Sequence, residues 1–359
     1  MPVIKEERHL IVPIFIPHQG CPFQCIYCRQ DKITNQSTPV SASFIKNTID
    51  TSLKSPRFLS ADIREVAFYG GTFTNLPLAK MEEVLGAVSP YLEQGLFNSI
   101  RVSTRPDSVD IYRLELMRHY GVSTVELGVQ SMDDKVLTLS KRGHTARDVI
   151  NAVSLLRRHG FKIGIQLMPG LPGDTESIFN DTINKVIELN PDMARLYPVV
   201  VINGTELASM YNKGVFRPLR LDEAVRISGE SCIRLEDNLI PVIRIGLMSS
   251  PSLLREGEIL AGPWHSAFGF LVRSYIHHKK IQPLLSGFTG TAEIGIRAPM
   301  SEIPLVRGYK NEGVRLLEKK SGMRIRYIKS DNSIPNGRIE VDRVNQDAGY
   351  LLQDTGRKF

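Results

Sequence analysis

The chain has 359 residues, of which 42% are hydrophobic and 23% charged, a balance typical of a folded globular protein and not of a disordered or fibrous one. Residues 1–10 include acidic side chains and precede only a short, mostly apolar run, residues 10–16, so this stretch predicts neither a signal peptide nor a membrane span. We therefore expect a cytoplasmic protein that contacts no membrane. The net charge of +7 and the pI near 9.2 are compatible with an anionic partner such as RNA, a nucleotide or a CoA ester, although the basic residues are dispersed along the sequence.

Between residue 10 and about residue 200, short apolar runs alternate with longer amphipathic segments. The predicted strands are residues 10–16, 64–70, 99–104, 123–129, 161–167 and 193–199. The predicted helices between them are residues 41–55, 77–90, 108–119, 146–159 and 174–189. Asp107, Thr145 and Asp174 are the expected N-caps, and Gly121 and Gly160 are expected to end two helices. Strands and helices alternating at this spacing predict βαβ units and a parallel sheet.

Polar and glycine-containing segments stand directly after successive predicted strands. In chain order they are the cysteine segment, Gly70 to Thr72, Arg105 to Asp107, Gln130 with Ser131, and Pro169 to Gly173. A barrel brings the C-terminal ends of all its strands to one rim, whereas an open sheet spreads them along an edge. We therefore predict an α/β fold with a partial (βα)6 TIM-type barrel.

The pattern changes after about residue 200. A helix is expected over 221–237, a further strand over 241–247 and another helix over 265–278; two later β-like runs cover 323–328 and 338–344. We assign residues 1–250 to the barrel with its site and residues 251–359 to a small α+β extension. A cover over the substrate pocket and a simple packing extension are equally good interpretations of that extension.

Three of the four cysteines fall within eight residues, as Cys21, Cys25 and Cys28 in a C-x3-C-x2-C pattern after the first strand. Clustered thiols in a long cytoplasmic chain indicate metal ligands, and three thiolates on a [4Fe–4S] cluster leave one iron open to a substrate. The alternative is a zinc site with His18 as fourth ligand. Cys232 lies in a helical pattern and is expected to be a buried small hydrophobe.

Further candidate residues lie on the same predicted rim. Gly70 and Gly71 would let the backbone approach a ligand closely, because neither carries a Cβ. Arg105, Gln130, Arg142 and His144 are also expected near it. Arg142 could pair with a carboxylate and Gln130 could bind a ribose or a carboxylate, whereas a cap or a surface contact is the ordinary role of such residues.

Together these segments resemble the radical S-adenosylmethionine (SAM) superfamily, and within it the radical SAM domain of the Elongator catalytic subunit family. The shared segments are residues 21–28, 70–74, 104–107, 126–131, 142–145, 160–175 and 196–207. The resemblance covers roughly residues 10 to 250.

The resemblance implies that Cys21, Cys25 and Cys28 hold a [4Fe–4S] cluster, which cleaves SAM to a 5′-deoxyadenosyl radical that abstracts hydrogen from a substrate. It also implies SAM contacts, with Tyr27 against the adenine, Gly70, Gly71 and Thr72 at the methionine amino group, and Ser103, Gln130, Arg142 and Gln166 elsewhere on SAM. Ser103 departs from the pattern, because glutamate is common at this position in the family.

The sequence departs from the Elongator family in other ways. We expect no acetyltransferase domain in it, and no counterpart of the extra zinc-binding cysteines or of the basic N-terminal extension. We therefore expect radical chemistry, with tRNA or a nucleotide as candidate substrate and flavodoxin or ferredoxin as candidate electron donor. The alternatives are a radical SAM enzyme for a small molecule or peptide, and a non-catalytic zinc-binding RNA-interaction protein.

Overall fold

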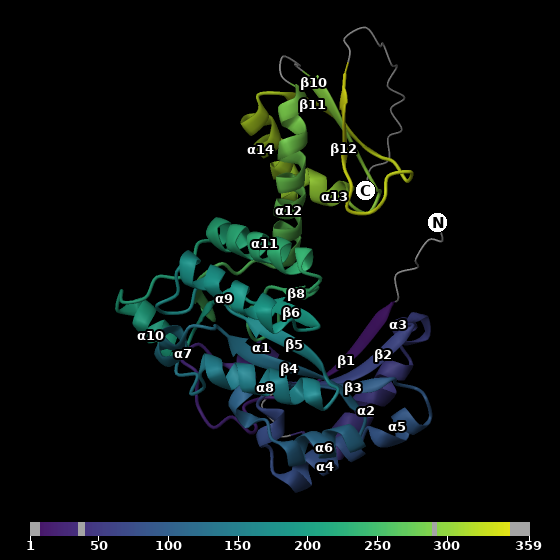
Figure 1. The fold of residues 1–359 in the computed structure, drawn as a ribbon, viewed down its shortest axis with the longest axis vertical. Coiled ribbons are helices and arrows are strands. Elements are labelled where there is room, and N and C mark those ends of the chain that lie inside the picture. The colour runs from purple at the N-terminus through teal and green to yellow at the C-terminus, as the bar shows by residue number, and fades with distance from the viewer. Residues whose placement is uncertain (1–7, 35–39, 289–292, 345–359) are drawn as a thin grey trace. The chain divides into compact units, whose positions relative to one another are not determined.

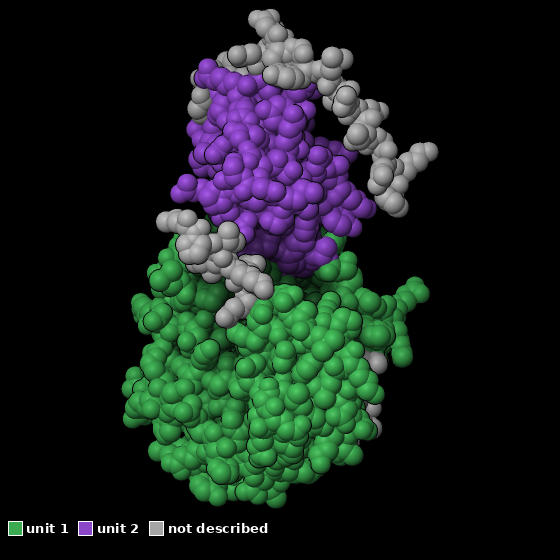
Figure 2. Space-filling view, turned by 90° about the vertical axis from the view of Figure 1, so that its right-hand side faces the viewer, with its two compact units in different colours: residues 1–266 green, residues 267–359 purple. Residues whose placement is uncertain are grey.

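The computed structural model describes residues 8–34, 40–288 and 293–344. Clustering of spatial contacts divides the chain into two compact units, unit 1 with residues 1–266 and unit 2 with residues 267–359, coloured separately in Figure 2. No helix within the described ranges is both long and apolar enough to cross a membrane.

Unit 1 is built on a seven-stranded parallel sheet that curls into a partial barrel (Figure 1). Its strands are β1 (His9–Ile16), β2 (Ile63–Gly70), β3 (Ser99–Thr104), β4 (Val122–Gln130), β5 (Lys162–Leu167), β6 (Met193–Leu196) and β8 (Val242–Ile245). They lie side by side in chain order, as right-handed βα repeats require. The partial barrel with a C-terminal extension is therefore confirmed, and the strand predicted over 241–247 is its seventh.

Helices pack on the outer face of this sheet (Figure 1). The longer ones are α2 (Ala42–Leu53), α4 (Leu78–Gly86), α6 (Ile111–His119), α8 (Ala146–Arg158), α9 (Glu176–Leu189) and α11 (Leu221–Asp237). Shorter helices lie in the connections between elements, as α1 (Gln30–Thr34), α3 (Pro56–Ser60), α5 (Ser89–Glu93), α7 (Asp134–Leu139) and α10 (Glu206–Asn212). A small ladder joins β7 (Val201–Ile202) to β9 (Ile259–Ala261). On β2 the apolar Val66 and Phe68 are fully buried, while the alternate residues face the barrel interior.

Two of the three expected N-caps are wrong by a few residues. Thr145 caps α8 in a capping box with Asp148, as predicted. However, α6 begins after Asp110 and α9 after Thr175. The two aspartates predicted for those roles serve the adjoining loops, because Asp107 pairs with Arg105 and Asp174 accepts the amide of Gly170.

Unit 2 packs helices on one face of a three-stranded sheet. Its elements are α12 (Phe268–Leu285), β10 (Glu293–Ala298), α13 (Ile303–Arg307), α14 (Glu312–Ser321), β11 (Arg324–Ser330) and β12 (Glu340–Arg343). The sheet order is β11-β10-β12, and Ile294, Ile296 and Leu317 lie in its core. The sequence reading missed β10 and α14, and it ended the first helix before Pro283, which α12 includes.

Candidate active site

The partial barrel of unit 1 encloses a cavity of about 1000 Å³. Strand residues line it in alternation, such as Glu65 and Tyr69 on β2 or Arg101 and Ser103 on β3. Since side chains alternate across a strand, the remaining positions face the helices and carry the apolar core. The loops after β1 and β2 close one end of the cavity with the cysteines and the Gly-Gly pair.

The cysteine segment forms the loop between β1 and α1, and all three cysteines border the cavity. Cys25 is buried, and its neighbour Ile26 ties the loop down at both backbone groups. The Ile26 amide donates to the Ser140 carbonyl at 3.4 Å, and its carbonyl accepts the Leu207 amide at 2.8 Å. Segments more than 100 residues away therefore fix the position of this loop.

The three thiols lie near enough to influence one another. Burial, and then the negative charges of Cys25 and Cys21, raise the pKa of Cys28 to about 12. Within the described ranges, however, no three Cys, His, Asp or Glu side chains stand close enough together to hold a metal ion as they are. The cluster-ligand assignment therefore depends on the spacing, the chemistry of three thiols and their common cavity.

His18, the possible fourth zinc ligand, forms hydrogen bonds within this loop. Its Nε2 accepts the amide of Gln30 at 3.1 Å, and its own amide donates to the Gln30 side chain at 2.6 Å. His18 thereby links the start of the cysteine loop to the start of α1.

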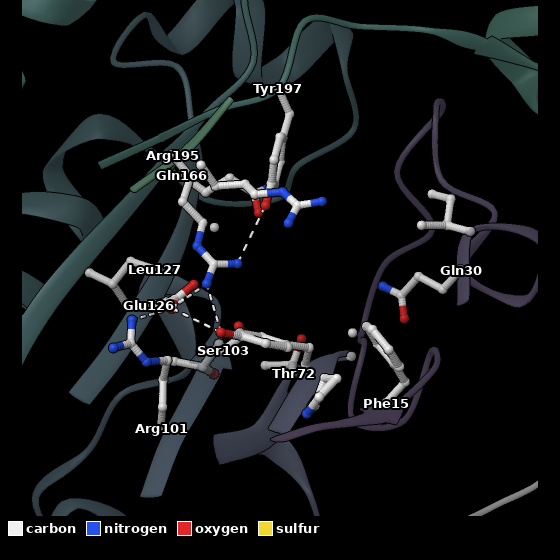
Figure 3. Close-up of a pocket in the computed structure, with 18 of the residues that line it drawn as sticks. Phe15, Gln30, Thr72, Arg101, Ser103, Glu126, Leu127, Gln166, Arg195 and Tyr197 are labelled. Carbon is white, nitrogen blue, oxygen red and sulfur yellow. Dashed lines mark hydrogen bonds and ion pairs between the residues drawn. The ribbon is translucent and has the colours of Figure 1, made fainter. Parts of the chain in front are cut away.

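The glycine pair after β2 packs against the backbone of the cysteine loop. A Cβ on Gly71 would stand 2.0 Å from the Gln19 carbonyl oxygen, and Gly70 has a φ of +100°. The Gly71 and Thr72 amides donate to the Ile16 and Gln19 carbonyls, and the Thr72 hydroxyl lies 3.5 Å from Cys21 Sγ. The glycines thus allow the two loops to pack closely. This explanation for glycine at positions 70 and 71 differs from the close approach of a ligand that the sequence predicted. Both glycines still border the cavity, as does Thr72, which Figure 3 labels.

Arg142 reaches the cysteine loop from the segment after α7. Its Nη1 donates to Cys25 Sγ at 3.0 Å, and its Nη2 donates to the Gly128 carbonyl. Arg105 donates to the Arg142 carbonyl and pairs with Asp107 through two bonds of 2.9 Å. The guanidinium of Arg142 thus joins the Cys25 sulfur to the end of β4.

The remaining predicted SAM contacts also border the cavity, as Tyr27, Ser103, Gln130 and Gln166. Gln130 ends β4 with a φ of +71°, and its Oε1 accepts Gln166 Nε2 at 3.2 Å. The two amides therefore orient each other across neighbouring strands.

His144, expected near the same rim, does not line the cavity. It is buried, and its Nε2 lies 3.2 Å from the Val129 carbonyl, which assigns the proton to Nε2. Burial, and then the charges of Arg142 and Arg105, lower the pKa of His144 to about 3, so it is neutral. Its role is to hold the turn after β4.

A buried charge network crosses the cavity wall, and the sequence reading missed it (Figure 3). Arg101 donates to Glu65 at 2.6 Å and to Glu126 at 2.8 Å. Arg195 donates to the same Glu126 oxygen at 2.8 Å and to the Tyr69 hydroxyl at 2.6 Å. Burial, followed by the charge of Glu126, raises the pKa of Tyr69 to about 12, which keeps the phenol protonated.

The signal for this network was present in the strands. Glu65, Arg101, Glu126 and Arg195 each interrupt a run of apolar residues, at positions that alternate with the core residues. A charge inside a strand points to the face opposite the core. The pairing itself could not be read from sequence, because it joins side chains of four different strands.

Comparison with known proteins agrees with this geometry. The sequence model of the Radical SAM superfamily matches residues 15–186, and that of the radical SAM C-terminal domain matches residues 191–278. A tRNA uridine(34) acetyltransferase of Methanocaldococcus infernus is 39% identical over 129 residues, covering 35% of this chain and 24% of that protein. The heme chaperone HemW of Bacillus subtilis is 27% identical over 199 residues, covering 54% of this chain and 52% of that one.

Among solved structures, the archaeal Elp3 of Methanocaldococcus infernus shares the fold, with a TM-score of 0.59 and 24% identity over 77% of this chain and 64% of that one. The chain spans between about a quarter and two thirds of the length of the first curated relatives it matches. The two family matches lie side by side along the barrel. The chain therefore belongs to the radical SAM superfamily, whose members use a [4Fe–4S] cluster and SAM.

Proposed function

We propose that Cys21, Cys25 and Cys28 are the three protein ligands of the [4Fe–4S] cluster, and that the enzyme uses the resulting radical to modify an RNA nucleotide. The observation that carries the proposal is that all three thiols border the same cavity as the rim residues of β2 to β5. When bound there, the cluster would supply the electron that cleaves SAM.

The residues around the thiols fit this role. Arg142 places a positive charge 3.0 Å from Cys25 Sγ, and the Thr72 hydroxyl lies within reach of Cys21. Hydrogen bonds of this kind orient the ligand atoms of a metal site.

The SAM contacts proposed for this cavity come from four strand ends, the cysteine loop and the segment after α7. They are Tyr27 for the adenine, Gly70, Gly71 and Thr72 for the methionine amino group, and Ser103, Gln130, Arg142 and Gln166 for the remaining polar groups. The hydrogen bond between Gln130 and Gln166 supports a fixed orientation of these two amides. Ser103 would bind less strongly than a longer acidic side chain.

Two observations support an RNA nucleotide as the substrate. Several of the curated relatives are tRNA uridine(34) acetyltransferases, and the chain carries a net charge of +7. A small-molecule or peptide substrate is the competing proposal. For the electron donor we propose flavodoxin or ferredoxin, and for the compartment the cytoplasm, where the cysteines would stay reduced.

The radical chemistry is tested by anaerobic reconstitution with iron and sulfide, then incubation with SAM and dithionite. We expect about four iron atoms per chain and formation of 5′-deoxyadenosine. Cys25→Ala should lose both the cluster absorbance and SAM cleavage. Cys232→Ala is the matched control, because Cys232 is fully buried in α11 and should leave both intact.

Full SAM cleavage by Cys25→Ala, or recovery of zinc in place of iron, would contradict the ligand assignment. The substrate class is tested by adding tRNA to the wild-type reaction. A faster release of 5′-deoxyadenosine with tRNA supports the RNA substrate, and no change favours a small molecule.

A further inference from the structure

The net charge of the chain resides entirely in unit 2. Residues 1–266 contain 29 Lys and Arg against 29 Asp and Glu, whereas residues 267–359 contain 16 against 9. Unit 1 is therefore formally neutral, and unit 2 carries the whole +7. The family matches end at residue 278, so most of this basic unit lies outside them.

Several acidic side chains of unit 2 form ion pairs with the same two residues, Arg297 and His277. Arg297 alone binds three of them, Asp331 at 2.6 Å and Glu340 and Asp342 at 2.8 Å each. Glu302 is paired with His277 at 2.9 Å inside the unit. Among the described residues of unit 2, the other acidic side chains are Glu293, Glu312 and Glu318.

Four of those other basic residues lie close together in sequence around one turn. The basic cluster is Lys319, Lys320, Arg324 and Arg326, all exposed, at the junction of α14 and β11. In the part of the chain that the structure describes, Lys319, Lys320 and Arg326 make no ion pair, and Arg324 only approaches Glu293 at 4.0 Å. Gly322 ends α14 in the left-handed region, so the chain turns sharply between the two pairs of cations.

Two apolar residues, Met323 and Ile325, lie among these cations and pack against the core of unit 2. One turn earlier on α14, Leu316 is 52% exposed. Binding to a membrane surface grows with the apolar area that is inserted, and a single leucine supplies little of it. Exposed cations along an open turn instead match a repeating anion, the phosphate backbone of a nucleic acid.

We propose that unit 2 is an RNA-binding module and that the basic cluster holds the phosphate backbone of the substrate RNA. The inference rests on the proposed RNA substrate and extends it by assigning RNA affinity to a part of the chain that does not contain the SAM cavity. Positive charge at the C-terminal end of α14 also suits the helix dipole. That role accounts for Lys319 and Lys320 only, whereas Arg324 and Arg326 lie beyond the helix.

The test compares two variants that each remove four positive charges. The first replaces Lys319, Lys320, Arg324 and Arg326 with glutamine; the control replaces four exposed cations of unit 1 with glutamine, namely Lys135, Arg147, Arg158 and Lys213. Binding of full-length protein to transcribed tRNA is measured between 50 and 200 mM salt, roughly the range over which phosphate contacts are lost. Vesicles of phosphatidylglycerol serve as a second anionic probe.

We expect the unit 2 variant to bind tRNA at least about tenfold more weakly, with its salt-dependence slope reduced by about 3, because each phosphate contact contributes about 0.7–0.9. The unit 1 control should change less than about twofold. Equal weakening in both variants, no tRNA binding by the wild type, or equal affinity of the wild type for vesicles would overturn the proposal. SAM cleavage without RNA, measured on the same samples, reports separately on the radical chemistry.

Discussion

Units 1 and 2 differ in where their charges lie. Unit 1 has equal numbers of acidic and basic residues and buries several of them as pairs inside the barrel, around Glu126. Unit 2 has an excess of basic residues and leaves most of them on its surface. Charges in unit 1 therefore bear on stability and on the shape of the cavity, while those of unit 2 bear on what the chain attracts.

The largest effect that tests this comparison is expected for Glu126→Gln. Glu126 is 5% exposed and accepts from both Arg101 and Arg195, so its loss removes the countercharge of Arg195 and leaves Arg101 with Glu65 alone. We expect a loss of about 3–5 kcal/mol in the free energy of unfolding. Glu312→Gln, at an exposed position of α14, should change it by less than about 0.5 kcal/mol.

Urea unfolding followed by circular dichroism measures both variants. Similar, small losses for the two substitutions would show that the buried pairs of unit 1 contribute no more than a surface charge of unit 2.

A smaller effect is expected from adding a methyl group to matched glycines. In Gly71→Ala the new Cβ would meet the Gln19 carbonyl of the cysteine loop at 2.0 Å, and the backbone must move. In Gly295→Ala of β10 it would meet the ring of Tyr327 at 2.1 Å, and a side chain can rotate away. We expect Gly71→Ala to cost about 1–3 kcal/mol and to impair cluster assembly, and Gly295→Ala to cost less and leave assembly intact.

Iron content after reconstitution, together with thermal unfolding, checks this pair. If Gly71→Ala assembled a full cluster with wild-type stability, the close packing of the two loops would not be required.

The smallest effect is a difference in pH dependence between two aspartates. Burial raises the pKa of Asp174 in unit 1 to about 6, whereas Ser333 and Arg297 lower the pKa of Asp331 in unit 2. A raised folded-state pKa means that the stability from Asp174 is complete below its unfolded pKa of about 4 and is lost as pH rises through about 6. Between pH 4 and pH 7 the free energy of unfolding of Asp174→Asn should therefore rise relative to that of the wild type, by on the order of 1–2 kcal/mol.

Asp331→Asn is the control for that experiment. Its lowered pKa places any change below pH 4, where stability is lost as pH falls, so the variant should follow the wild type from pH 5 to pH 8. Urea unfolding at three pH values distinguishes the two variants. A constant difference between Asp174→Asn and the wild type across this range would contradict the raised pKa.

Much of unit 1 was predictable because its strands are short apolar runs bounded by polar or glycine residues. The strand at 99–104 was predicted to the residue, and the cysteines and the glycine pair were correctly placed at one end of the cavity. Contacts that join distant segments were not predictable. The bond from Arg142 to Cys25 spans 117 residues, and no local pattern encodes it.

The elements of unit 2 were harder to predict from the sequence, for a different reason. β10 alternates isoleucine with Gly295 and Arg297, and neither of these has the β-propensity that marks a strand. The basic residues of unit 2 are dispersed and form no long basic run, so no local pattern reveals their excess. The excess appears only when charges are summed over a unit whose boundary the fold defines.

The alternation of charged and apolar residues on the barrel strands also limits how this chain can change in evolution. Inserting or deleting one residue inside β2, β3 or β4 would turn Glu65, Arg101 or Glu126 toward the helices and expose the core to the cavity. Length variation among homologous chains should therefore be confined to the loops, with these three strands keeping a constant length.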